Sequence, residues 1–220
     1  MTLSPDRSPG GGRLAPGVGP LLFLDVDGPL NKGWWTSPER FPGLRDAGWH
    51  AERVTGCPLH EDFRVVLNPA WGQLLLGLAD LGATLAWATG WGACANDHIG
   101  PLLGLPELPV APAVYGAKAS TVIPWGQGRP WAWLEDDAEE LEAATALSPP
   151  GVPCLPVLVD KATGLTPKHV ARVASWLTRL QPAPHAPALR RRPGLGRDPD
   201  GHAHPGWTEP APARNTKAAP

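Results

Sequence analysis

Short apolar runs alternate with helical stripes along the middle of this chain. Apolar runs of strand length occupy residues 21–24, 83–88, 131–134 and 155–159, with weaker candidates at 63–67 and 108–114. Stripes of helical spacing occupy residues 70–81, 93–103, 138–147 and 167–180, and a weaker one begins at Lys118 and is interrupted by Pro124. Strands that alternate with helices predict an α/β fold, a Rossmann-like, doubly wound parallel sheet.

Boundary residues support two of these helices. Asn68 and Pro69 suit the N-cap and the first position of the helix over 70–81. Thr166 and Pro167 suit the start of the last helix in the same way. We therefore expect both helices to begin at these residues.

The two ends of the chain and one internal stretch lack this alternation. Residues 1–19 are rich in glycine, proline and serine, and residues 182–220 hold nine prolines without apolar periodicity. We expect both ends to be disordered, leaving residues 20–181 as one domain. Within it, residues 32–67 are irregular apart from the candidate strand, and at about 36 residues they are too short for a large helical cap. They are expected to form a small insert or flap.

Charge is unevenly distributed along the chain. The net charge is −2, but residues 21–180 carry 17 acidic and 11 basic side chains, whereas residues 181–220 carry three and six. The acidic domain does not resemble a nucleic-acid scaffold by charge alone. The basic tail, with Arg190, Arg191 and Arg192, is either a solvated segment or a contact for phosphates or an acidic partner.

The three cysteines, Cys57, Cys94 and Cys154, are far apart in the sequence and odd in number. This argues against a disulfide framework and predicts reduced thiols. The N-terminus lacks an apolar signal core, and no apolar stretch approaches about 18 residues. We expect a cytoplasmic protein with no membrane partner.

The candidate chemistry begins where the first strand ends. Residues 21–24 run directly into Asp25, and Asp27 and Gly28 follow. Ligands of open α/β sheets bind at the carboxyl ends of the strands, and two carboxylates this close repel each other without a cation or a proton. The pattern therefore predicts a metal site that also holds a nucleophile. A calcium loop is the alternative, but its fifth and twelfth positions would be Pro29 and Thr36, which do not suit it.

Three later features follow in an order that matches this site. Thr89 comes directly after the apolar run 83–88, Lys118 begins a helix, and an acidic cluster, Glu135-Asp136-Asp137, follows the run 131–134. In a parallel sheet these positions meet at the same edge. Arg129 competes with Lys118 as the basic residue, and the metal ligand within the acidic cluster stays open.

These residue types suit phosphoryl transfer. Asp25 can attack phosphorus as a nucleophile, and Asp27 can act as general acid and base. Gly28 allows a sharp turn beside a bound phosphate. Thr89 and Lys118 can stabilise phosphoryl oxygens. Hard oxygen ligands for Mg²⁺ would come from Asp25 and Asp27 together with Glu135 and Asp136.

The same motifs resemble those of the haloacid dehalogenase (HAD) superfamily, whose first motif is an apolar strand followed by Asp-x-Asp-Gly. The segments at 67–72, 87–91 and 101–106 look like the HAD domain of bacterial Swiss-army-knife RNA repair proteins. The resemblance covers about residues 21–180. It implies the HAD fold and the roles given above, with Gly28 and Gly90 contacting the substrate. Two residues depart from the family pattern, Pro29 after motif one and Glu135 in place of an aspartate.

The family places a mobile flap after motif one, where this chain has Trp34 and Trp35. These tryptophans are expected either to stack on a base or sugar of the substrate or to pack within the flap. We therefore expect a Mg²⁺-dependent phosphatase with an aspartyl-phosphate intermediate, acting on nucleic-acid ends or nucleotides. The alternatives are transfer to an acceptor other than water and a silent HAD-fold binding or regulatory protein.

Overall fold

The computed structural model describes residues 19–33, 42–57 and 63–181. Contacts between Cα atoms divide the chain into two units, Met1–Gln181 and Pro182–Pro220, and every described residue belongs to the first. The predicted disordered ends, apart from Gly19, lie outside the described ranges. So do Trp34 and Trp35, the two aromatic residues predicted to contact the substrate.

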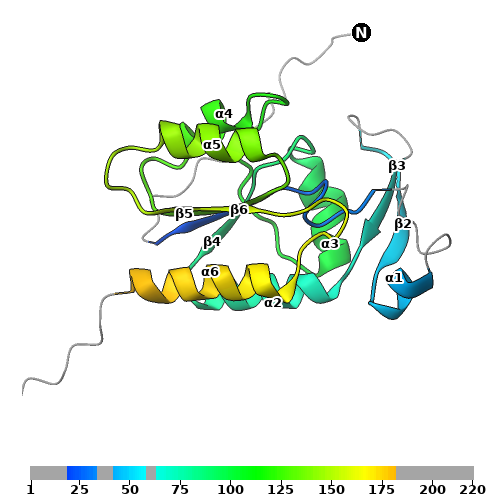
Figure 1. Ribbon diagram of the computed structural model, residues 1–220. Coiled ribbons are helices and arrows are strands. Elements are labelled where there is room, and N and C mark those ends of the chain that lie inside the picture. The colour runs from blue at the N-terminus through cyan, green and yellow to red at the C-terminus, as the bar shows by residue number, and fades with distance from the viewer. Residues whose placement is uncertain (1–18, 34–41, 58–62, 182–220) are drawn as a thin grey trace, which may run out of the picture. The chain divides into compact units, whose positions relative to one another are not determined.

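A four-stranded parallel sheet forms the centre of the first unit (Figure 1). Its strands stand in the order β4, β1, β5, β6, and each neighbouring pair is parallel. The bounds are Leu21–Leu24 for β1, Thr84–Trp87 for β4, Trp131–Glu135 for β5 and Cys154–Leu158 for β6. Leu24 is in register with both Trp87 and Leu134, so β1, β4 and β5 reach the same edge of the sheet. The predicted α/β class with a parallel sheet is confirmed.

Helices cover both faces of the sheet (Figure 1). They are α2 (Ala70–Asp80) and α6 (Pro167–Leu180) on one face, and α4 (Lys118–Trp125) and α5 (Ala138–Leu147) on the other. Successive strand residues point to opposite faces. Accordingly, Leu22 and Leu24 pack in one apolar cluster with α2 and α6, whereas Leu21 and Phe23 pack in another with α4 and α5. None of the described helices is long and apolar enough to cross a membrane.

Local capping explains where the helices begin. The carboxylate of Asp137 accepts hydrogen bonds from the first turn of α5, and Thr166 and His169 form a capping box at the start of α6. The predicted bounds of these two helices are confirmed. Helix α2 begins one residue after Pro69, and the side chain of Asn68 accepts a hydrogen bond from its first N–H at 3.0 Å.

The insert contains more regular structure than expected. Between β1 and α2 lie a short helix, α1 (Pro42–Asp46), and an antiparallel pair of strands, β2 (His50–Val54) and β3 (Phe63–Leu67). The prediction that this region is irregular outside 63–67 is therefore wrong. Strand β2 is mostly exposed and polar, so it lacks the apolar pattern by which strands are recognised.

Two other elements differ from the prediction. The expected helix over 93–103 consists of turns, a π-helical segment η2 (Ala95–Ile99) and the short helix α3 (Gly100–Leu103). Residues 108–114 add only a single parallel bridge, between Val110 and Trp87. Helix α4 continues one residue past Pro124 and ends at Trp125, so the expected interruption falls at the end of the helix.

The prediction of reduced thiols is also wrong for two cysteines. Cys57, which follows β2, and Cys94, which follows β4, form a disulfide with their Cα atoms 5.9 Å apart. Their 37-residue separation gave no sign of this, because the fold of the insert brings them together. Cys154 is a free thiol.

Candidate functional site

The candidate site lies at the edge where the strands of the parallel sheet end. Asp25 follows β1, Glu135 ends β5, and Thr89 comes two residues after β4. The backbone N–H of Asp25 continues the sheet by donating to Leu134 at 3.0 Å. All three side chains are buried, and Glu135 is fully so. Segments far apart in the sequence are thus brought together here, as expected for an open α/β sheet.

Lys118 joins two of these carboxylates. Its Nζ lies 3.0 Å from Oδ2 of Asp25, and 3.0 and 2.8 Å from the two carboxylate oxygens of Glu135. Lys118 is itself 9% exposed. A buried ammonium group shared by two buried carboxylates is a charge arrangement that a folded protein maintains at a cost in desolvation. Such arrangements are frequent at functional sites.

Glu140 holds the backbone that carries Lys118. It is buried on α5, and its two carboxylate oxygens accept hydrogen bonds from the N–H groups of Lys118 and Ala119, at 2.9 and 2.7 Å. These N–H groups begin helix α4 and have no partner within the helix. The carboxylate also lies at the positive end of the helix dipole. Glu140 therefore fixes where Lys118 enters the site.

Thr89 contacts the same carboxylate as Lys118. Its hydroxyl group lies beside Asp25 and acts, with Lys118, to lower the pKa of that carboxyl group. Its Oγ1 also accepts a long hydrogen bond, 3.4 Å, from the backbone N–H of Trp91. The neighbouring Gly90 is exposed, with no heavy atom within 4 Å of the place where a Cβ would stand. The backbone at Gly90 is therefore open to solvent.

Asp27 is held apart from these groups. Nδ2 of Asn31 donates to one of its carboxylate oxygens at 2.6 Å, and the indole N–H of Trp91 donates to the other at 2.9 Å. The residue is exposed, whereas Asn31 and Trp91 are buried. Asn31 is anchored in turn, because its Oδ1 accepts hydrogen bonds from the N–H groups of Gly33 and Val66. Asp27 thus faces solvent with its orientation fixed.

Gly28 allows the turn after β1 to approach Asp136, which follows β5. Its φ is +92°, and a Cβ built on it would lie 2.5 Å from Cγ of Asp136. Both the backbone conformation and the close approach require glycine. The predicted role of Gly28 was a sharp turn beside the substrate. In the fold, the absence of a Cβ at Gly28 also leaves space for the carboxylate of Asp136.

Burial and neighbouring charges shift the pKa values of the buried site residues. Burial raises the pKa of Asp25, although Lys118 and Thr89 counteract this. Burial, and then the charge of Asp25, raises the pKa of Glu135 to about 9. Burial alone would lower the pKa of Lys118, but the adjacent carboxylates of Asp25 and Glu135 raise it above its ordinary value. Two buried carboxylates therefore compete for one ammonium group, and a second cation would stabilise both in their ionised form.

Three carboxylates are close enough to hold such a cation. Asp25, Glu135 and Asp136 each offer an oxygen, and these oxygens lie within 4.8 Å of one another. A set of hard oxygen donors suits Mg²⁺, which commonly retains several waters besides one or two carboxylates. The donor set fits the predicted metal, and it selects Glu135 and Asp136 from the acidic cluster. Asp27, a further predicted ligand, does not belong to this group, because its oxygens face Asn31 and Trp91.

Arg129, the competitor of Lys118, lies at the other end of the sheet. Its guanidinium group donates to the carbonyl of Gly19, which precedes β1, and to the hydroxyl of Thr84, the first residue of β4, both at 2.8 Å. Arg129 therefore takes no part in the site.

A cavity of about 480 Å³ borders the site at Asp136. Its walls include Lys161, Lys168 and His169 from the segment that ends in α6. Asp160 also lines it, so the cavity carries both acidic and basic side chains beside the carboxylate cluster.

The sequence pattern did not single out Asn31, Trp91 or Glu140 as site residues. Asn31 ends the first motif, and Trp91 stands two residues after Thr89. Their closeness to predicted site residues was the one indication in the sequence that they belong to the site. Glu140 looked like one of several acidic residues at a helix start. Its contact with Lys118 depends on the packing of α5 against α4, which no local pattern reveals.

Comparison with known proteins assigns no family. No protein-family model matches the chain, and no curated protein matches its sequence.

Proposed function

We propose that the protein is a Mg²⁺-dependent phosphohydrolase of the HAD type that forms an aspartyl phosphate on Asp25. The observation that carries the proposal is the contact of Asp25 with Lys118, 3.0 Å long and buried, at the sheet edge beside Glu135 and Asp136. Nucleophile, positive charge and metal-binding carboxylates are the parts that phosphoryl transfer needs. The motif resemblance adds to this support.

In the first step, a carboxylate oxygen of Asp25 attacks phosphorus and the bond to the leaving oxygen breaks. Asp27 donates the proton that the leaving oxygen takes up. Its exposure allows it to exchange protons with water, and Asn31 and Trp91 keep it oriented. Lys118 and the hydroxyl of Thr89 stabilise the charge of the phosphoryl oxygens.

In the second step, water attacks the aspartyl phosphate. Asp27, now ionised, accepts a proton from that water, and the phosphorus–oxygen bond to Asp25 breaks to release phosphate. Asp25 returns to its carboxylate form beside Lys118. Asp27 therefore acts as acid and then as base.

Asp25, Glu135 and Asp136 would hold the metal. When bound, Mg²⁺ supplies positive charge that offsets the negative charge of the phosphoryl group and of the carboxylates around it. The HAD fold itself belongs to this proposal, because the parallel sheet with helices on both faces is shared by many α/β proteins.

We infer that the substrate is a phosphate ester with further negative charge, such as a nucleotide or a nucleic-acid end. The support is the cavity beside Asp136, where Lys161 and Lys168 can pair with an anion once a cation offsets the carboxylates, although Asp160 also lines it. The insert between β1 and α2 is short, so a bulky substrate would have room.

One observation favours the silent binding protein as the second candidate. Both oxygens of Glu135 accept from Lys118, so Glu135 competes with Asp25 and with any bound phosphate for the ammonium group. Glu135→Asp, which shortens this side chain, separates the two candidates. If the wild-type protein is silent, it should bind orthovanadate with Mg²⁺ but hydrolyse no ester. The Glu135→Asp variant should then gain turnover, because its shorter side chain would release Lys118 for the phosphoryl group.

The decisive experiment is a phosphatase panel on metal-free protein, with and without added Mg²⁺. The panel contains an aryl phosphate, mononucleotides, and oligonucleotides phosphorylated at the 3′ or the 5′ end. We expect Mg²⁺-dependent release of phosphate, fastest from a nucleotide or oligonucleotide. Hydrolysis that persists in excess chelator would contradict the metal assignment, and no hydrolysis of any ester would favour the binding protein.

A further inference from the structure

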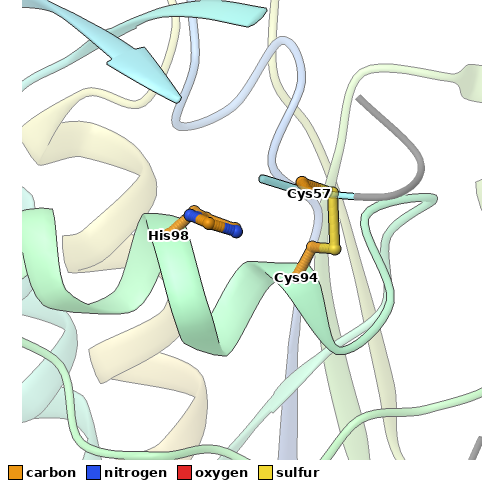
Figure 2. A group of neighbouring side chains, drawn as sticks. All are labelled: Cys57, Cys94 and His98. Atoms are coloured by element: carbon orange, nitrogen blue, oxygen red, sulfur yellow. A yellow bond between two sulfur atoms is a disulfide. The ribbon is translucent and has the colours of Figure 1, made fainter. Parts of the chain in front are cut away.

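A second group of potential metal ligands lies away from the carboxylate site. Cys57, Cys94 and His98 each offer one ligand atom, and these atoms lie within 4.8 Å of one another. Figure 2 shows the imidazole of His98 pointing toward the Cys57–Cys94 pair. None of the three takes part in the proposed phosphoryl transfer.

The backbone places these side chains from two parts of the fold. Cys94 and His98 are four residues apart on the helical turns after β4, so they lie on one face. Their segment includes the π-helical turn Ala95–Ile99. This conformation is rare in proteins overall, but where it occurs it is often at a functional site. Cys57 comes from the insert, after β2. The cluster therefore fastens the insert to the segment that follows Thr89.

The chemistry of the donors selects the cation. Two thiolates and an imidazole suit Zn²⁺, whereas Mg²⁺ prefers the oxygens of the other cluster. Ligand atoms of a tetrahedral zinc site lie about 3.4 to 3.8 Å apart, given bonds of about 2.1 to 2.3 Å. Once the sulfur–sulfur bond is broken, small side-chain movements bring three atoms within 4.8 Å to that spacing. The fourth position would be taken by water.

We propose that Cys57, Cys94 and His98 form a zinc site in the reduced protein, and that the disulfide is its oxidised, metal-free state. With hydrogen peroxide as oxidant, each zinc-bound thiolate loses one electron and the sulfur–sulfur bond forms. The oxygen–oxygen bond of the peroxide accepts both electrons and breaks, giving two hydroxyl groups that leave as water after protonation, and Zn²⁺ is released. Either state joins the insert to the sheet, so the insert stays fastened under reducing and oxidising conditions.

His60 follows Cys57 by three positions in the sequence, but it lies outside the described residues. The site is also distinct from Cys154, the free cysteine on β6. Because Cys154 is the remaining cysteine, its serine variant is a matched control for the two ligand cysteines.

The test is zinc binding to the full chain, reduced with a phosphine that does not bind zinc strongly. Excess Mg²⁺ is present to occupy the carboxylate cluster. We expect about one zinc ion per reduced chain and none after treatment with hydrogen peroxide. Cobalt in place of zinc should give the absorption bands of a tetrahedral thiolate complex.

Variants separate the site from other sources of binding. Cys57→Ser and Cys94→Ser should each weaken zinc binding at least about 100-fold, His98→Ala should weaken it about 10-fold or more, and Cys154→Ser should leave it unchanged. With free zinc near 100 times Kd, zinc should raise the Tm of the reduced wild-type protein by about 5 to 10 °C but not that of Cys94→Ser. If a cysteine variant fails to fold, His98→Ala with the cobalt spectrum still tests the site.

Two results would overturn the proposal. One is a reduced wild-type protein that binds no zinc while circular dichroism shows it folded. The other is zinc binding that His98→Ala and both cysteine variants leave unchanged. Neither result bears on the phosphatase panel, so the failure of this proposal is distinguishable from that of the proposed function.

Discussion

The indole N–H of Trp91 donates a 2.9 Å hydrogen bond to the carboxylate of Asp27, and the same ring packs edge-on against Phe63 of the insert, with centroids 5.5 Å apart. The acid–base residue of the proposed reaction is therefore oriented by a side chain that also contacts β3. This relationship couples the insert to the chemistry at the sheet edge.

Trp91→Phe should lower kcat about 10-fold for alkyl phosphates and less for aryl phosphates, because a misoriented Asp27 matters most when the leaving oxygen needs a proton. The phenyl ring keeps most of the packing against Phe63. Trp71→Phe is the matched control, since the buried indole nitrogen of Trp71 has no hydrogen-bond partner within the described structure. Steady-state kinetics on both ester types measure the effect, and equal losses in the two variants would argue against an orienting role.

Asp25→Asn should lower turnover more than about 1,000-fold while leaving the fold intact, because the amide is a poor nucleophile. Asp80→Asn, on the exposed surface of α2, is the control for a neutralised aspartate. Wild-type activity in the Asp25 variant would refute the mechanism. Trapping phosphate on Asp25 in the wild-type protein, followed by mass spectrometry, tests the intermediate directly.

Gly28→Ala should weaken Mg²⁺ binding, because the added methyl group would displace the carboxylate of Asp136. The left-handed backbone adds a strain of about 1 to 2 kcal/mol. Gly82→Ala is the control, since its φ of +95° is similar but nothing lies within 4 Å of its Cβ position. Calorimetric titration with Mg²⁺ compares the two, and only the Gly28 variant should lose affinity.

Glu140→Ala should destabilise the protein by about 1 to 3 kcal/mol, because it leaves two buried N–H groups at the start of α4 without an acceptor. It should also lower kcat, because Lys118 would no longer be held beside Asp25. Glu139→Ala, exposed on the same helical turn, should change neither quantity by much. Urea unfolding and ester hydrolysis provide the measurements, and a stability loss without a kinetic loss would limit Glu140 to a structural role.

Much of the fold was predictable because its strands and helices are strongly patterned. The apolar run ending at Asp25 and the capped helix α6 are examples, since the first is a continuous buried run, the second has a helical period, and each has a clear boundary residue. Strand β3 was a weak candidate in the sequence, but its partner β2 was missed because β2 is exposed and polar. The motif order also placed Asp25, Thr89 and Lys118 at one edge of the sheet, as the structure has them.

The rest of the site depends on contacts between distant segments. Trp91 and Glu140 acquire their partners only when the helices and the insert have packed. The same is true of the Cys57–Cys94 disulfide, which residue spacing gave no reason to expect. Sequence periodicity reports which face of an element is buried, but not which residue it will meet there.

The capping box at the start of α6 makes one wall of the cavity sensitive to acid. Nδ1 of His169 accepts from the backbone N–H of Thr166 at 3.2 Å, which only an imidazole without a proton on that nitrogen can do. Burial, and then the charge of Arg172, lowers the pKa of His169 below its ordinary 6.5. This contribution to stability is therefore present above about pH 6.5 and is lost as the pH falls through the lower value in the folded protein.

On acidification the first turn of α6 should fray, which amide hydrogen exchange measures. The same turn in a His169→Gln variant should not change with pH. Because Thr166 and His169 both line the cavity, acid would then loosen one wall of the site where we propose that the substrate binds.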